Sequence, residues 1–255
     1  MKFVAIIPAR YASTRFPGKP LALLDGKPVI QRVYEQVDGV VDKTVVATDD
    51  ARIATVVENF GGSVVMTSTT HRSGTDRCNE ALDYINNDFD VVINVQGDEP
   101  FIRKEQINSL KCCFDDKSTD IATLVKPFSK DDPIDLLNNP NSPKVVLGNK
   151  KEALYFSRSV IPYIRNAKNT SDWLSSHVFY KHIGIYAYKV DVLRAITKLP
   201  QSSLEIAESL EQLRWLQNGF KIKVEITDIE TIGIDTPEDL HRAELFLKYN
   251  QSFQN

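Results

Sequence analysis

An apolar segment that leads into a short loop rich in cations restricts the possible folds of this chain more than any other stretch. Residues 3–7 are nearly all apolar, as expected for a central parallel strand covered on both faces. The loop after them carries Arg10, Arg15 and Lys19, with small residues between these cations. Backbone N–H groups and guanidinium groups in such a loop bind polyphosphate, so the junction predicts a phosphate site at a strand end.

The loop does not match the best-known phosphate-binding motif. Gly18 and Lys19 are followed by Pro20, and no glycine stands at the earlier position that a Walker A loop requires. From this stretch alone, a solvated basic turn therefore remains an alternative to a phosphate site.

Strand and helix patterns alternate four times through residues 3–100. Short strands that alternate with amphipathic helices predict an α/β fold with a doubly wound, mostly parallel, Rossmann-like sheet. Ligands bind such sheets at the carboxyl ends of the strands, so the polar loops that follow the strands are expected to face one crevice. The expected strands are residues 3–7, 44–47, 63–66 and 90–95, and the loops are residues 8–20, 48–49, 67–75 and 96–100.

The second half of the chain has a different character, with a long polar stretch between its first strands. Residues 183–188 alternate, which places His182 and Tyr186 on one face of a strand. Residues 204–218 predict one helix, in which Glu211 and Gln212 lie opposite the apolar stripe. That stripe consists of Ile206, Leu210 and Leu213. The other expected strands are residues 121–125, 144–147 and 221–226.

Length and composition exclude several classes of protein. The chain has 255 residues, 42% of them hydrophobic, which is ample for one large α/β domain or two small ones. The net charge of −3 gives no reason to expect nucleic acid as a partner. The three cysteines form no C-x-x-C pair, and no apolar run has the roughly 18 residues that span a bilayer. We therefore expect a soluble cytoplasmic protein without membrane insertion.

Two carboxylates stand where a metal could be held. Asp98 ends the fourth strand within Gln-Gly-Asp-Glu-Pro, and Gly97 before it can adopt an unusual backbone angle. Asp235 precedes a helix that Thr236 is expected to cap. Mg²⁺ is usually bound by one or two carboxylates together with substrate phosphates, so the pair fits a metal used in phosphoryl-type transfer. Taken singly, a turn residue and a helix-end carboxylate remain the alternatives.

A set of motifs in a fixed order closely resembles the 3-deoxy-manno-octulosonate cytidylyltransferase family, also called CMP-Kdo synthetases. The resemblance runs from residue 3 to about residue 248, with Pro143 in place of a small apolar residue. The motifs are Pro8-Ala9-Arg10, Ser13-Thr14-Arg15, Pro17-Gly18-Lys19-Pro20, Val46-Ala47-Thr48-Asp49, His71-x-Ser73-Gly74-Thr75-Asp76-Arg77, Asn94-Val95-Gln96-Gly97-Asp98-Glu99-Pro100, Tyr155-Phe156-Ser157-Arg158, His182-x-Gly184-Ile185-Tyr186, Ser209-Leu210-Glu211-Gln212-Leu213-Arg214 and Gly233-Ile234-Asp235-Thr236-Pro237-Glu238-Asp239-Leu240.

The resemblance implies that CMP passes from CTP to the anomeric hydroxyl of Kdo with Mg²⁺, giving CMP-Kdo and pyrophosphate. It implies catalytic roles for Arg10, Lys19, Asp98 and Asp235, the two aspartates being the metal ligands. The implied nucleotide-binding residues are Ala9, Arg10, Thr14, Arg15, Lys19, Ser73, Gly74, Arg77 and Gln96. The implied sugar-binding residues are Gln96, Arg158, His182, Tyr186, Glu211 and Gln212.

The sugar-binding assignments depend most on the resemblance. Arg158 can pair bidentately with the carboxylate of Kdo, but a surface ion pair would explain it equally well. Tyr186 could be a core aromatic residue, and Glu211 and Gln212 a solvated helix face. The resemblance also implies a homodimer and three segments: a nucleotide-binding half at 1–125, a sugar-binding and dimerisation part at 126–226, and a return to the core at 227–255.

Three other functions compete with this interpretation. The closest is a cytidylyltransferase for a related acidic sugar such as 8-amino-Kdo or a sialic acid. A glycosyltransferase of similar fold would usually carry an Asp-x-Asp motif, where this chain has Gly97-Asp98-Glu99. A non-catalytic nucleotide-binding regulator would not need Lys19, Asp98 and Asp235 together. The sequence leaves open whether the product enters lipopolysaccharide or capsule.

Overall fold

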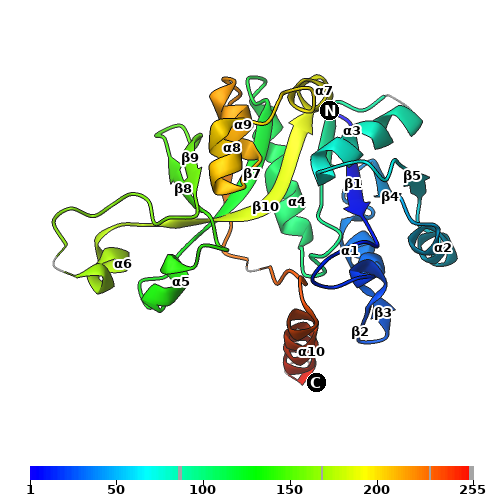
Figure 1. Ribbon diagram of the computed structural model, residues 1–255, viewed down its shortest axis with the longest axis horizontal. Coiled ribbons are helices and arrows are strands. Elements are labelled where there is room, and N and C mark those ends of the chain that lie inside the picture. Colours follow the sequence, from blue (N-terminus) through cyan, green and yellow to red (C-terminus); the bar gives the residue numbers. More distant parts are fainter. Residues whose placement is uncertain (86–87, 168, 230, 253–255) are drawn as a thin grey trace. The chain divides into compact units, whose positions relative to one another are not determined.

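The computed structural model describes residues 1–85, 88–167, 169–229 and 231–252, and Figure 1 shows the elements along the chain. The chain forms two compact units: unit 1 is Met1–Asn108 with the segment from Thr231 onward, and unit 2 is Ser109–Glu230. The expected boundary at residue 125 falls inside strand β7 (Ile121–Pro127). This strand belongs to unit 2 because its hydrogen-bonded partners are there.

Unit 1 contains a parallel sheet of four strands in the order β6-β1-β4-β5. The predicted parallel arrangement of the first four strands is therefore confirmed. Every residue of β1 except Pro8 is buried, which explains its continuous apolar sequence. The strands are β1 (Phe3–Ala9), β4 (Lys43–Thr48), β5 (Val64–Met66) and β6 (Val91–Asn94), with a small hairpin of β2 (Leu23–Leu24) and β3 (Lys27–Pro28).

Side-chain caps start the two helices α2 and α3, which follow strands β4 and β5. Asp50 accepts a hydrogen bond from the backbone of Arg52 (2.9 Å) at the start of α2, as expected for an aspartate that directly precedes a helix. Ser73 caps α3 through the backbone N–H of Asp76 (3.1 Å). The helices and 3₁₀ turn of unit 1 are η1 (Lys19–Leu21), α1 (Val29–Val37), α2 (Ala51–Asn59), α3 (Gly74–Tyr84) and α10 (Pro237–Ser252). Helix α4 (Lys104–Cys112) crosses the boundary at Asn108, and the turn η2 (Cys113–Asp115) after it belongs to unit 2.

The C-terminal segment packs onto unit 1 through its own apolar cluster. Ile234 and Ala243 are fully buried against Leu24 and Val29, and Phe101 meets the ring of Phe246 edge to face at 5.0 Å. Burying these side chains stabilises the position of the loop before α10 by about 1.5–3 kcal/mol per large residue. This packing brings the segment around Ile234 and Asp235 beside the loop that follows β6.

Unit 2 contains a mixed sheet in which β7 lies between β11 and β10, parallel to the first and antiparallel to the second. The pairing of β10 with β7 shifts between Ile183 and Tyr186, which marks a bulge. The remaining strands are β8 (Lys144–Leu147), β9 (Ala153–Ser157), β10 (Tyr180–Lys189) and β11 (Ile222–Ile226). The helices and 3₁₀ turn are α5 (Ile134–Asn138), η3 (Thr170–Asp172), α6 (Trp173–Ser176), α7 (Val190–Ile196), α8 (Ser203–Glu208) and α9 (Gln212–Gln217).

The single helix predicted for residues 204–218 is wrong, because α8 and α9 are separate helices. Ser209 between them has a φ of 51°, in the left-handed region, which ends α8. The faces predicted for a single helix are also wrong in part, because Ile206 of α8 is 65% exposed and Gln212 of α9 is only 5% exposed. Leu213 is buried as expected. No helix within the described ranges is both long and apolar enough to cross a bilayer.

Candidate active site

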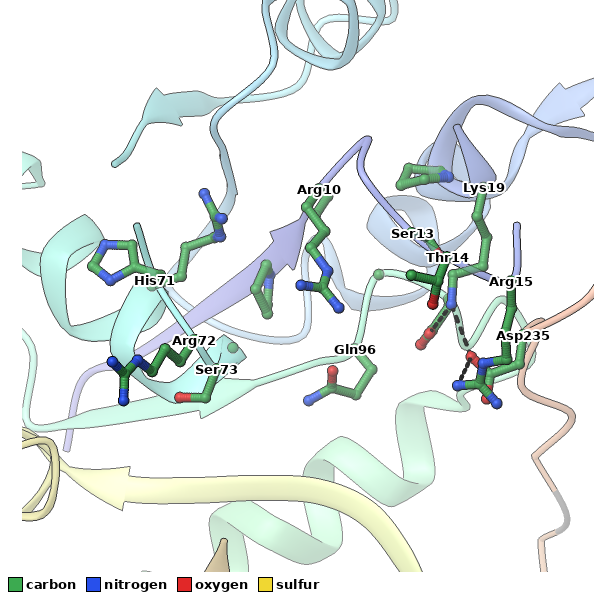
Figure 2. Close-up of a pocket in the computed structure, with 17 residues that line it drawn as sticks. Arg10, Ser13, Thr14, Arg15, Lys19, His71, Arg72, Ser73, Gln96 and Asp235 are labelled. Carbon is green, nitrogen blue, oxygen red and sulfur yellow. Dashed lines mark hydrogen bonds and ion pairs between the residues drawn. The ribbon is translucent and has the colours of Figure 1, made fainter. Parts of the chain in front are cut away.

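A cavity of about 310 Å³ opens in unit 1, and four separate segments of the chain line it (Figure 2). It is lined by all the residues that the sequence analysis assigned to nucleotide and metal, namely Ala9, Arg10, Thr14, Arg15, Lys19, Ser73, Gly74, Arg77, Gln96, Asp98 and Asp235. The volume falls within the range of small-molecule sites. Of the four loops expected at this edge of the sheet, three line the cavity directly.

Close backbone approaches bring these loops together at the end of β1. A Cβ atom added at Gly97 would lie 2.9 Å from the carbonyl oxygen of Pro8, which is too close for any other residue without movement. A Cβ at Gly74 would lie 3.1 Å from the Pro8 side chain. Gly97 does not have a positive φ, so the predicted reason for this glycine was wrong. The position requires the absence of a side chain because the backbone of β1 passes beside it.

Backbone hydrogen bonds hold Asp235 beside Asp98. The N–H of Ile234 donates to the carbonyl oxygen of Asp98 (2.8 Å), which joins two segments far apart in sequence. The carboxylate of Asp239 accepts from the N–H groups of Asp235 (3.0 Å) and Thr236 (2.9 Å). Burial raises the pKa of Asp239, but hydrogen bonds from the Asp235 backbone and from Arg242 outweigh it, and the net pKa is lowered. Asp239 therefore stays ionised and anchors the turn that carries Asp235.

The ammonium group of Lys19 lies between the two carboxylates assigned to metal. Its Nζ is 2.5 Å from Asp98 Oδ2 and 3.1 Å from Asp235 Oδ1. Arg15 approaches the same Asp235 oxygen at 3.2 Å, as Figure 2 shows. Only 13% of the Lys19 side chain is exposed, against 66% for Arg15. Two carboxylates thus converge on one cation position inside the cavity.

The arginines that line the cavity differ in what they can offer a ligand. Arg77 is 4% exposed, and its guanidinium already donates to Thr67 Oγ1 (2.6 Å) and to Asp49 Oδ2 (2.8 Å). Arg77 therefore supports the loops around the cavity. Asp49 does not line the cavity itself, but it holds the Arg77 guanidinium in place. Arg10, by contrast, is exposed, and Figure 2 shows its guanidinium in the cavity.

His71 and Arg72 are among the lining residues that were not assigned from the sequence. Both lie in the loop between β5 and α3, which was expected to face the crevice. The position of this loop after a parallel strand could therefore have indicated them as lining residues. Glu80 holds this loop, because it accepts hydrogen bonds from the backbone of Ser68 (2.8 Å) and from the ring of His71. Burial raises the pKa of Glu80, but the hydrogen bonds from Ser68 and His71 outweigh this effect. The net pKa is lowered, so the Glu80 carboxylate stays ionised.

The residues assigned to sugar binding lie in unit 2, around β10. The rings of His182 and Tyr186 are 5.2 Å apart, as expected for residues on one face. Burial lowers the pKa of His182 to about 3, so its ring is neutral at physiological pH. Its Nε2 lies 3.0 Å from Thr123 Oγ1, and its backbone N–H donates to the carbonyl of Pro143 (2.9 Å).

Tyr186 combines deep burial with an unused hydroxyl group. Its ring packs against Trp215 of α9, with centroids 5.1 Å apart. Its hydroxyl has no hydrogen-bond partner within the part of the chain that the structure describes. Burial and the nearby charge of Glu211 raise the pKa of Tyr186 well above its usual value, so the group is a neutral donor. A buried, unpaired hydroxyl is costly, and a ligand would remove that cost.

Arg158 is held by backbone carbonyl groups. Its guanidinium donates to the carbonyl oxygens of Glu208 (2.6 Å), Pro140 (2.9 Å) and Ser209 (3.2 Å). In return, the Glu208 carboxylate accepts from the Arg158 backbone (2.9 Å) and from Ser157 Oγ (2.6 Å). Three of the five guanidinium N–H groups are thus engaged, two of them at the C-terminal end of α8 and one at Pro140 in the loop after α5.

Comparison with known proteins gives consistent matches over nearly the whole chain. A family model described as cytidylyltransferase matches residues 4–226. The 3-deoxy-manno-octulosonate cytidylyltransferase of Bacteroides thetaiotaomicron is 67% identical over 248 residues, covering 97% of this chain and 99% of the relative. That of Porphyromonas gingivalis is 59% identical, covering 96% of each. The solved structure of CMP:2-keto-3-deoxy-manno-octonic acid synthetase complexed with CTP is 42% identical, with a TM-score of 0.90 over 98% of this chain and 100% of that one.

Proposed function

Because this chain belongs to the cytidylyltransferase family, we propose that its two units divide the recognition of nucleotide and sugar between them. The activity is that of a CMP-Kdo synthetase, which forms CMP-Kdo and pyrophosphate from CTP and Kdo. The observation that carries the residue assignments is the cavity of unit 1, where segments from both ends of the chain meet around one carboxylate pair.

Unit 1 binds CTP. Arg10 and Arg15 are exposed cations of the loop after β1, and with Lys19 they hold the triphosphate and stabilise the charge of the departing pyrophosphate. Ser73 and Gly74 begin α3, whose N-terminus adds backbone donors. The base is bound beside the lining groups Ala9, Ser73 and Gly74, with Arg77 supporting the loops around them, and Gln96 completes the polar wall.

Asp98 and Asp235 would hold Mg²⁺. Both are within 3.1 Å of the Lys19 ammonium, so their oxygens already face one cation. The described residues contain no group of three or more His, Cys, Asp or Glu side chains suited to a metal. Two carboxylates completed by substrate phosphates are the usual arrangement for Mg²⁺, which this pair fits. When bound, the ion neutralises charge on the triphosphate.

Unit 2 binds Kdo. His182 and Tyr186 share a face of β10, and the unpaired hydroxyl of Tyr186 supports a role as donor to a sugar oxygen. Glu211 and Gln212 stand at the start of α9, directly after the α8 end that Arg158 holds. Arg158 keeps two N–H groups beyond those three carbonyl bonds, and these would bind the carboxylate of Kdo.

The residues support direct transfer without a covalent enzyme intermediate. The anomeric hydroxyl of Kdo attacks the α-phosphate of CTP and releases its proton to water, the bond to the β-phosphate breaks, and pyrophosphate leaves. No nucleophilic side chain is required, and the rate comes from positioning and charge stabilisation. Arg10 and Lys19 line the cavity of unit 1, and their positive charges stabilise the negative charge that develops on the departing pyrophosphate.

Pyrophosphate release tests this function. The enzyme is expected to release pyrophosphate from CTP and Kdo, and to use ATP or GTP far less, because its family consists of cytidylyltransferases. Parallel reactions with 8-amino-Kdo and a sialic acid distinguish the neighbouring cytidylyltransferases. Equal rates with a purine triphosphate would contradict the assigned base pocket. A clear preference for another acidic sugar would move the assignment to that sugar.

We also infer a homodimer that forms through unit 2. Tyr163 is 75% exposed yet packs edge to face on Trp173, and Val178 is 50% exposed beside the buried Phe179. Exposed apolar groups that extend a buried cluster mark an interaction surface. Val178→Lys is expected to shift the sedimentation coefficient from dimer to monomer, whereas the same change at exposed Ile206 is not. A wild-type monomer at micromolar concentration would refute the dimer.

The compartment we propose is the cytoplasm, where CTP is made. The three cysteines of the chain, Cys78, Cys112 and Cys113, are free thiols, and this suits a reducing environment. The proposed destination of CMP-Kdo is lipopolysaccharide or capsule.

A further inference from the structure

The proposed roles of Lys19 and of the two aspartates compete for the same place. Lys19 Nζ lies within hydrogen-bond distance of one oxygen of Asp98 and one of Asp235. These are the carboxylates that would hold the metal, and Lys19 is the residue that would bind the triphosphate. An ammonium group between the two carboxylates repels a second cation, and Mg²⁺ needs the same oxygens at about 2.0–2.1 Å.

We propose that Lys19 is a tethered counter-cation that occupies the metal position until nucleotide binds. The ammonium stabilises the carboxylate pair in the free enzyme and weakens metal binding there. The triphosphate offers Lys19 new acceptors, so nucleotide draws the ammonium away and opens the carboxylate pair to the metal. This inference rests on the assignment of Asp98 and Asp235 as metal ligands, and it adds an order of events at that site.

The backbone around Lys19 suits such an exchange. Gly18 has a φ of 72° and its N–H donates to the carbonyl of Tyr11 (2.9 Å), so the base of the side chain is fixed. Lys19 begins the 3₁₀ turn η1, which continues into the buried Pro20 and closes through the Leu21 N–H to the Gly18 carbonyl (2.8 Å). The charge sits at the end of four rotatable bonds, so the ammonium can move while the loop stays in place.

Arg15 cannot replace Lys19 in this role. It reaches only Asp235, at 3.2 Å, and two thirds of its side chain is exposed. Solvent therefore screens its contribution strongly. Lys19 touches both carboxylates and is 13% exposed, so its charge acts on the metal position in a less screened environment.

Direct metal titration tests the proposal without any turnover. The probe is Mn²⁺ alone, followed through the electron paramagnetic resonance of the free ion, with no nucleotide present. Lys19→Met is expected to bind Mn²⁺ about tenfold or more tightly than the wild type, because the competing charge is gone. Lys19→Arg keeps a cation and is expected to bind as weakly as the wild type. Lys27→Met is the control, because Lys27 pairs with the exposed Glu35 in the same unit.

The same Lys19→Met variant is expected to lose affinity for CTP when titrated calorimetrically in EDTA. Opposite changes for metal and nucleotide are the signature of the exchange, since a folding defect would weaken both. Unchanged or weaker Mn²⁺ binding by Lys19→Met, or none at all, would overturn the proposal.

The carboxylate variants separate this proposal from the metal assignment. Asp98→Asn in the Lys19→Met background is expected to remove the gain in Mn²⁺ affinity. If it leaves the gain intact, the ion binds elsewhere and the assignment of Asp98 fails. If Asp98→Asn weakens Mn²⁺ binding while Lys19→Met does not strengthen it, the assignment stands and the exchange is refuted.

Discussion

Replacing Asp98 with Asn is expected to lower turnover by about 100-fold or more, the scale seen when one charge-stabilising group is lost from an active site. The amide keeps the size of the side chain but cannot bind Mg²⁺ as a carboxylate does. Asp235→Asn is expected to have an effect of the same order, since both carboxylates face one cation. The measurement is steady-state pyrophosphate release at saturating CTP and Kdo, with Mg²⁺ varied.

Folding should be little affected in either variant. The backbone carbonyl of Asp98 keeps its bond to Ile234, and the turn at Asp235 keeps its anchor on Asp239. Thermal unfolding provides this check, and Asp38→Asn on the exposed end of α1 serves as the matched control. Near-normal turnover at saturating Mg²⁺ would rule out the substituted residue as a ligand.

Arg158→Ala is expected to weaken the use of Kdo by about ten- to 150-fold and to leave CTP binding nearly unchanged. A charge-assisted bidentate bond to a carboxylate contributes about 1.5–3 kcal/mol, which gives this range. Arg158→Lys should recover only part of the loss, because an ammonium cannot reproduce the planar fork. Lys19→Ala should show the opposite pattern, with nucleotide binding or turnover damaged and Kdo contacts intact. Kinetics with Kdo varied and calorimetric titration of CTP measure both.

The three carbonyl bonds of Arg158 make a second measurement necessary. Their loss frees the end of α8, so Arg158→Ala is also expected to lower the unfolding temperature. Arg165→Ala, at an exposed arginine of the same unit, should change neither property. A drop in unfolding temperature with an unchanged KM for Kdo would show that Arg158 is purely structural. Loss of CTP binding with an unchanged Kdo dependence would contradict the division between the two units.

The sequence by itself determined the parallel sheet of unit 1 and most of the residues that line its cavity. Apolar runs, helix periodicity and caps such as Asp50 depend on neighbours within a few residues, so local patterns predict them. Parallel strands have their carboxyl ends at one edge, which brings the loops around Arg10 and Gln96 together without knowledge of any contact. The ordered motifs then identified the family.

The tertiary structure alone decided which partners the site residues have. Lys19 lies between carboxylates 79 and 216 positions away, and Ile234 bonds to Asp98 because α10 packs back onto unit 1. The break at Ser209 overrode a regular helical pattern, and Gly97 is required by the passing backbone of β1. Such contacts depend on how distant segments pack, and packing free energy outweighs the small local preferences that a sequence pattern records.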